Sequence, residues 1–147
     1  MHPRIFLATA LSLSIAHKGS VAVALTGPRS SKLGVDLEWV KPQAQSWREA
    51  SFTSAERSLI EGLASTDEMS ALCYCAAWCL KEALAKATGE GLGAPRRWRL
   101  EALSVHNEAE LSWGHGRVEG YELSWWTLKP QVEGPRLVIA YAALRST

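Results

Sequence analysis

The sequence predicts an α+β fold in which an antiparallel β-sheet packs against one long α-helix. Three observations support this: strand-like alternation in the first forty residues, one long segment with apolar residues at helical spacing, and a C-terminal third of short strand-like segments separated by glycine and proline. The chain has 147 residues, of which 47% are apolar. This length and composition suit a single domain over residues 1–147 with a packed core.

Three strands are expected before the first helix. Residues 5–16 and 21–25 alternate along the chain with strand periodicity, and a third strand is expected at 33–39 after the break at Gly27-Pro28. Side chains of a strand alternate between its two faces. In the third strand, one face therefore carries Leu33, Val35 and Leu37, and the other carries Gly34, Asp36 and Glu38.

The beginning of the chain also imitates a secretory signal, because Arg4 precedes an apolar stretch that ends in the triplet Ser14-Ile15-Ala16. The alternation of this stretch favours a strand instead. The three cysteines, Cys73, Cys75 and Cys79, form an odd and local set, which is a poor disulfide framework. Their spacing on a helix points them in different directions, so they do not share a metal. We expect a cytoplasmic protein with buried, reduced cysteines.

Two helices are expected in the middle of the chain. Thr53 and Glu56 form a capping-box pattern that begins a short helix ending near Leu63. A long helix is expected over 70–88, ended by Gly89 and Gly91. Its core-facing residues are Leu72, Ala76, Cys79, Leu80, Ala83, Leu84 and Ala87. Further strands are expected at 98–105, 111–113, 121–128 and 137–143.

The charge balance restricts the classes of partner. The formal net charge is +1, which argues against binding nucleic acid through bulk charge. No apolar run approaches the length that spans a bilayer, so we expect neither nucleic acid nor a membrane as partner.

Three carboxylates and a lysine are the first chemical signal. Asp36 and Glu38 point the same way from one strand, about 6.6 Å apart along it. Glu82 and Lys86 are four residues apart and are neighbours on one helix face. If the helix crosses the sheet there, three carboxylates converge, and such a cluster needs a cation. Carboxylate oxygens suit Mg²⁺, which takes further ligands from substrate phosphates. Without such convergence, the same residues are a solvated helix pair and an exposed strand edge.

The order of several motifs resembles the 4′-phosphopantetheinyl transferases, and most closely the branch that activates peptide and polyketide synthetases. The resemblance covers about residues 13–143. It is carried by Ser14-Ile15-Ala16-His17, Leu33-Gly34-Val35-Asp36-Leu37-Glu38, Trp78-Cys79-Leu80-Lys81-Glu82-Ala83-Leu84-Ala85-Lys86 and Gly89-Glu90-Gly91-Leu92. The Gly-x-Asp-x-Glu and Trp-x-x-Lys-Glu-x-x-x-Lys elements occur together and in order, which makes the pattern specific.

The resemblance implies an enzyme of the holo-(acyl-carrier-protein) synthase type. It would transfer 4′-phosphopantetheine from coenzyme A to a serine of an acyl or peptidyl carrier protein and release 3′,5′-ADP. The positions that match Asp36, Glu38 and Glu82 would hold Mg²⁺. Lys86 would contact the phosphates and is a candidate to protonate the leaving group. His17 would bind the 3′-phosphate, and Glu56 falls where some members have a proposed general base. The capping box alone also accounts for Glu56. The resemblance also implies that the region 47–63, which includes Phe52, meets the carrier protein. Arg48 and Arg57 are candidate contacts for an acidic carrier helix, although they could equally be ordinary helix surface.

Two departures from the family pattern bear on function. Ala16 stands where members usually carry a hydroxyl residue, so one contact to the 3′-phosphate is missing. The chain also resembles the second of the two halves that normally grip the coenzyme. We therefore expect either a homo-oligomer or an impaired half-enzyme that serves as a binding module for a carrier protein or nucleotide. An exported α+β protein with an accidental match is the remaining alternative.

Overall fold

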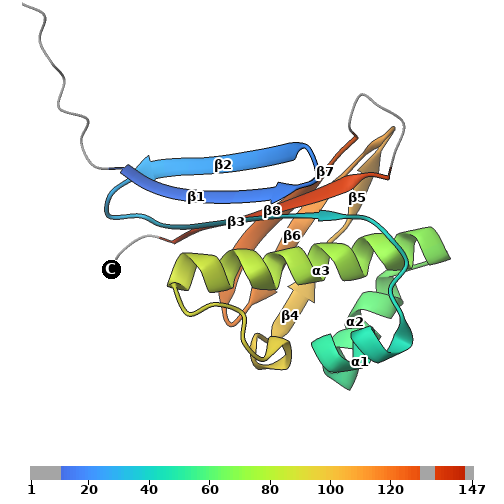
Figure 1. Cartoon of the computed structure of the whole chain (residues 1–147). Coiled ribbons are helices and arrows are strands. Elements are labelled where there is room, and N and C mark those ends of the chain that lie inside the picture. Colours follow the sequence, from blue (N-terminus) through green and yellow to red (C-terminus); the bar gives the residue numbers. More distant parts are fainter. Residues whose placement is uncertain (1–10, 130–134, 145–147) are drawn as a thin grey trace, which may run out of the picture.

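A computed structural model describes residues 11–129 and 135–144. Figure 1 shows strands at the start of the described chain, a group of helices in the middle and strands again toward the end. In chain order the elements are β1 (Leu11–Lys18), β2 (Val21–Pro28), β3 (Lys32–Trp39), α1 (Gln45–Ser51), α2 (Ser54–Leu63), α3 (Asp67–Thr88), the 3₁₀ turn η1 (Pro95–Arg97), β4 (Leu100–Leu103), β5 (His106–Glu108), β6 (Leu111–Val118), β7 (Tyr121–Leu128) and β8 (Leu137–Leu144).

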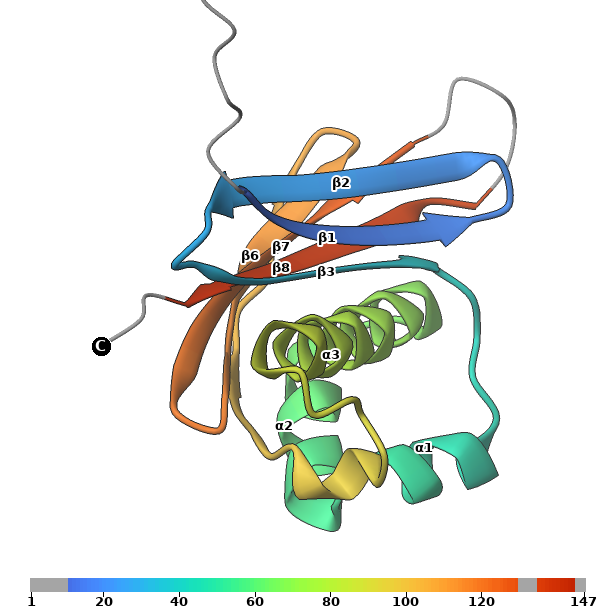
Figure 2. The ribbon, with the colours of Figure 1, turned by 60° about the vertical axis from the view of Figure 1, so that its left-hand side comes forward.

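The sheet has six antiparallel strands. Five follow the spatial order β3-β8-β7-β6-β4, and β5 pairs with β6 beyond this path. The strands β1 and β2 form a separate hairpin. In Figure 2, α3 lies against one face of the sheet and the hairpin covers β3 and β8 on the other face. The predicted α+β class, an antiparallel sheet packed on one long helix, is confirmed.

The helix α3 forms because its two ends are capped and most of its surface is apolar. The side chain of Thr66 accepts a hydrogen bond from the Met69 amide at the first turn, and Gly89 ends the helix in a left-handed conformation with φ 75°. The helix begins at Asp67, three residues before the predicted start, because Thr66 supplies a cap that the spacing of apolar residues did not indicate. All the predicted core-facing residues of this helix are buried.

The strand β3 lies between α3 and the hairpin. Its side chains alternate between these two neighbours, in agreement with the predicted alternation. Val35 and Leu37 pack toward the hairpin, in a cluster with Ala16 and Ile139. On the opposite face, a Cβ placed on Gly34 would lie 1.8 Å from the carbonyl oxygen of Ala83 in α3. Glycine is therefore required where the two backbones meet, and this close approach places the acidic face of β3 directly against α3.

Most of the predicted elements are present, with shifted ends. The first strand begins at Leu11 in the described residues; its predicted part at 5–10 lies outside them. The helix α1 and the strand β5 were not predicted, and β6 extends five residues beyond the predicted 111–113. Of the helices in the described part of the chain, none has both the length and the apolar character that crossing a bilayer requires.

Candidate functional site

The crossing of β3 and α3 brings Asp36 and Lys86 into contact. The Lys86 ammonium lies 3.0 Å from Asp36 Oδ1 and also donates to the backbone oxygen of Val35 at 3.0 Å. Asp36 is 6% exposed, and within the described residues its second oxygen, Oδ2, is buried without a hydrogen-bond partner. A buried, unpaired carboxylate oxygen is costly, so this atom is available to a ligand that the protein alone does not supply.

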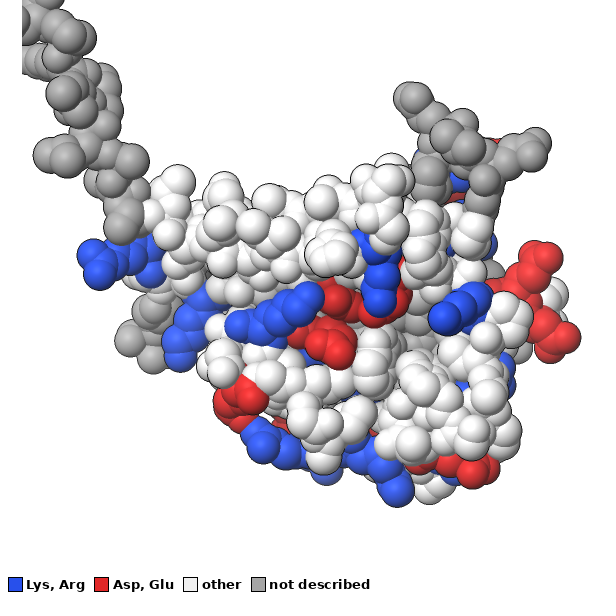
Figure 3. Space-filling view, viewed as in Figure 1, with Lys and Arg blue, Asp and Glu red and all other residues white. Residues whose placement is uncertain are grey.

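Two further carboxylates, Glu38 and Glu82, lie close enough to Asp36 for its charge to affect their pKa values. Burial raises the pKa of Glu38, and the Lys18 ammonium, 2.9 Å from its Oε2, partly opposes that rise. Burial also raises the pKa of Glu82, and the charge of Asp36 adds to the increase. Figure 3 shows acidic side chains gathered at the junction of α3 and β3 with basic side chains beside them. We call the three carboxylates Asp36, Glu38 and Glu82 the acidic cluster. Lys18 and Lys86 are its two lysines.

The predicted convergence of three carboxylates is only partly present. Asp36, Glu38 and Glu82 affect one another's charge, but among the described residues no three carboxylate, histidine or cysteine groups are close enough to form a ready-made metal site. Ammonium groups occupy one oxygen of Asp36 and one of Glu38 instead. The sequence analysis predicted that a metal ion balances these carboxylates. In the structure, lysine ammonium groups lie next to two of them instead.

A family model for the 4′-phosphopantetheinyl transferase superfamily matches residues 32–142, well over half of the chain. The chain belongs to this superfamily. No curated protein sequence matches it. The match begins at β3, so it includes Asp36, Glu38, Glu82 and Lys86 but leaves the β1–β2 hairpin outside. The resemblance drawn from the motifs is confirmed at the level of the superfamily, and membership implies a transferase.

The superfamily implies Mg²⁺, and the acidic cluster fits this ion. All its candidate ligands are carboxylate oxygens, which a hard cation prefers. The unpaired Oδ2 of Asp36 is a buried acceptor that still needs a positive partner. Burial raises the pKa of Glu38 and of Glu82, and the charge of Asp36 adds to both increases, so a bound cation would favour the ionised form of each carboxylate. Asp36, Glu38 and Glu82 are therefore the candidate ligands of this ion.

His17 lies on a different face from the acidic cluster. It is exposed on β1, on the same side as Leu11, Leu13 and Ile15, and it pairs with Ala22 in the hairpin ladder. The next residue, Lys18, points the other way and reaches Glu38. The role of His17 in binding a phosphate stays a prediction.

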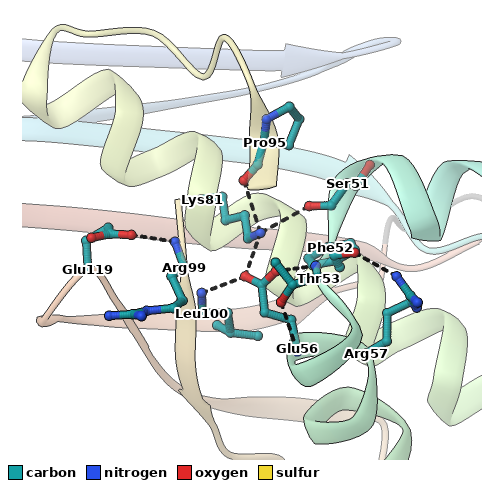
Figure 4. A network of polar contacts seen from close by, with 10 residues as sticks. All are labelled: Ser51, Phe52, Thr53, Glu56, Arg57, Lys81, Pro95, Arg99, Leu100 and Glu119. Atoms are coloured by element: carbon teal, nitrogen blue, oxygen red, sulfur yellow. Dashed lines mark hydrogen bonds and ion pairs between the residues drawn. The ribbon is translucent and has the colours of Figure 1, made fainter. Parts of the chain in front are cut away.

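Glu56 lies in a buried network of its own, shown in Figure 4. Its carboxylate is 2.8 Å from the ammonium of Lys81 and accepts hydrogen bonds from the Thr53 and Leu100 amides, each at 2.7 Å. The predicted capping box is present. Glu56 is 2% exposed, so the role of general base stays a prediction without a supporting contact, whereas the capping role accounts for its position.

Lys81 is the residue that sequence reasoning missed. Its side chain is completely buried, and its ammonium donates to the backbone oxygens of Ser51 and Pro95, each at 3.1 Å. It also lies 4.4 Å from the centre of the Phe52 ring. Lys81 follows Ala77 by four residues and precedes Leu84 by three, both of them buried. Helical spacing therefore indicated that Lys81 faces the core, but the sequence analysis considered only its neighbour Glu82 as a site residue.

The segment expected to meet a carrier protein, residues 47–63, forms α1 and α2. Phe52 is not available to a partner, because it is fully buried and stacks edge-on with Trp47 and Tyr74. Arg48 lies over the Tyr74 ring, and Arg57 donates to the backbone oxygen of Phe52 at 2.8 Å. These two arginines therefore have structural contacts in addition to any role at the surface.

A groove adjoins the acidic cluster on the side of α1. It has a volume of about 420 Å³ and is lined by Glu38, Lys41 and Pro42, together with the aromatic side chains of Trp39, Trp47 and Trp78. Trp78 precedes Glu82 by one helical turn. The groove therefore provides an apolar surface directly beside Glu38, one of the candidate metal ligands.

Proposed function

We propose that the protein transfers 4′-phosphopantetheine from coenzyme A to a serine hydroxyl of an acyl or peptidyl carrier protein, with Mg²⁺, and releases 3′,5′-ADP. The observation that carries this proposal is the Lys86–Asp36 pair at the crossing of β3 and α3, with an unpaired oxygen of Asp36 beside it. Membership of the superfamily supports the reaction class. The aromatic groove beside Glu38 gives room for part of a substrate.

The residues of the chain have distinct roles in this proposal. Asp36, Glu38 and Glu82 would hold Mg²⁺, which when bound neutralises charge on the pyrophosphate of coenzyme A. Lys86 is held by the Val35 carbonyl as well as by Asp36, so its ammonium has a fixed position from which to contact a phosphate oxygen. It is also placed to donate a proton to the departing phosphate. His17 would bind the 3′-phosphate.

A mass assay tests the proposal directly. Coenzyme A, Mg²⁺ and an apo carrier protein are incubated with the chain, and the carrier is expected to gain the mass of phosphopantetheine while 3′,5′-ADP appears. Asp36→Asn and Glu82→Gln each remove a ligand charge and are expected to lower the rate at least about a hundredfold. Glu68→Gln is the matched control, because Glu68 is exposed on the same helix. Full activity in either site variant contradicts the mechanism.

A binding module is the second candidate function, and the contact of Lys18 with Glu38 favours it because this contact occupies a ligand of the proposed metal. Such a module would hold coenzyme A or a carrier protein without transfer. Calorimetry with coenzyme A, with and without Mg²⁺, separates the two functions. Binding that is independent of the metal and is not followed by transfer supports the module.

Self-association belongs to the same proposal. Leu11, Leu13 and Ile15 are 62, 58 and 57% exposed on the outer face of β1, which leaves an apolar strip for a second copy to cover. Sedimentation at several concentrations gives the oligomeric state. A strictly monomeric active enzyme contradicts this part of the proposal.

A further inference from the structure

Lys18 and Lys86 bind the acidic cluster in different ways. Lys86 is fixed by two acceptors, Asp36 and the Val35 carbonyl. The Lys18 side chain is 40% exposed and meets one oxygen of Glu38, itself 25% exposed. Lys18 is the last residue of β1, and Gly19 follows it with φ 55° in the tight turn to β2. The Lys18 contact is thus a partly exposed ion pair on a long, flexible side chain, and such pairs are weak.

Charge balance decides whether Lys18 and a divalent cation can be bound together. The three carboxylates of the acidic cluster and its two lysines leave one net negative charge when all are ionised. A divalent cation added to this set makes the cluster positive, whereas a cation that replaces the Lys18 ammonium makes it neutral. The ammonium also occupies Oε2 of Glu38, one of the two oxygens that the cation would use. Both effects make binding of the two mutually unfavourable.

We propose that Lys18 is a built-in counter-ion that competes with a divalent cation for Glu38 and leaves that carboxylate when the cation binds. Lys18 is then a residue that sets the metal affinity of the site. This inference rests on the proposed metal site, but it does not need the transfer reaction. In the structure, the ammonium already occupies one oxygen of Glu38, which a bound cation would have to share or take over.

Titration of Mg²⁺ alone into the complete chain tests the competition, with heat as the readout and without coenzyme A or carrier. Lys18→Met removes the ammonium and keeps most of the length of the side chain. An exposed ion pair is worth up to about 1 kcal/mol, so this variant is expected to bind Mg²⁺ about fivefold more tightly than the wild type. Lys18→Arg keeps the charge and is expected to retain the wild-type affinity within about twofold.

Lys41 provides the matched control. Its charge also acts on Glu38, and it is exposed near the same carboxylate, but no contact joins the two. Lys41→Met is expected to raise the Mg²⁺ affinity less than twofold. An affinity of Lys18→Met that is no higher than that of the wild type overturns the proposal. An equal gain in Lys41→Met also overturns it, as does the absence of Mg²⁺ binding in both the wild type and Lys18→Met.

A second measurement uses the wild-type chain and does not depend on the folding of a variant. The ammonium signal of Lys18 in a nitrogen-resolved magnetic resonance spectrum is expected to shift as Mg²⁺ is added, while that of Lys41 stays in place. An unchanged Lys18 signal at saturating Mg²⁺ contradicts the displacement. If carrier modification fails but the Lys18 effects appear, the transfer proposal alone is wrong; if modification succeeds without them, only the competition is wrong.

Discussion

Replacement of Lys81 by methionine is expected to lower the free energy of unfolding by about 3–5 kcal/mol, because removal of one partner leaves a buried charge without compensation. The substitution would keep the apolar stem against Phe52 and remove the ammonium. Glu56 would keep its two amide donors but lose its cation, and the carbonyl oxygens of Ser51 and Pro95 would lose a donor. Each orphaned buried acceptor costs about 1–3 kcal/mol, so the two carbonyl oxygens alone account for about 2–6 kcal/mol, a range that includes the expected loss.

The assay is urea unfolding followed by circular dichroism, with equal slopes required for a valid comparison. Lys129→Met is the control, since Lys129 forms an exposed pair with Glu110 at 3.3 Å and its loss should cost no more than about 1 kcal/mol. The double variant Lys81→Met with Glu56→Gln removes both charges and should recover about 1–2 kcal/mol relative to Lys81→Met. A loss below 1 kcal/mol in Lys81→Met would refute the argument, because an ammonium with three acceptors would then contribute little to stability.

Three other substitutions test the fold independently. Gly34→Ala is expected to cost at least about 2 kcal/mol in urea unfolding, because its Cβ would meet the Ala83 carbonyl, which is backbone and cannot rotate away. Thr53→Ala removes the cap of α2 and should cost about 1 kcal/mol, and an unchanged midpoint would argue against the capping box. Burial, and then the hydrogen bond to Glu61, raise the pKa of Tyr74 from its ordinary value near 10 to about 12. The unfolded chain therefore loses the proton first, so stability is complete below pH 10 and falls as the pH rises toward 12; Tyr74→Phe should abolish this part of the fall.

The fold could be predicted from the sequence wherever one pattern dominated. Strand alternation correctly placed Asp36 on the face of β3 that meets α3, and the capping box at Thr53 placed the start of α2. The helix α1 was missed because it has seven residues and no side-chain cap, so its position depends on the packing of Trp47 against Phe52 and Trp78. The contact with Trp78 joins residues that are distant in the sequence, so it leaves no local signal.

The contacts of the candidate residues could be predicted from the sequence only in part, and the roles of these residues stay predictions. The pattern placed Asp36 and Lys86 together, and a 3.0 Å contact joins them. It did not indicate that Lys18 would bind Glu38, because Lys18 lies in a hairpin whose distance from β3 is set by tertiary packing. It also did not indicate which acceptors surround Lys81, because Ser51 and Pro95 lie in α1 and η1 and only tertiary packing brings them to α3.

The contact between Gly34 and Ala83 determines which substitutions the protein can accept over evolutionary time. Backbone atoms of β3 and α3 touch there, so the spacing between the strand and the helix does not depend on the sizes of the aliphatic residues around it. Those residues are free to drift among similar volumes while Asp36 and Lys86 keep their separation. The glycine itself has no such freedom, and divergence of this chain would leave it in place long after the neighbouring core had changed.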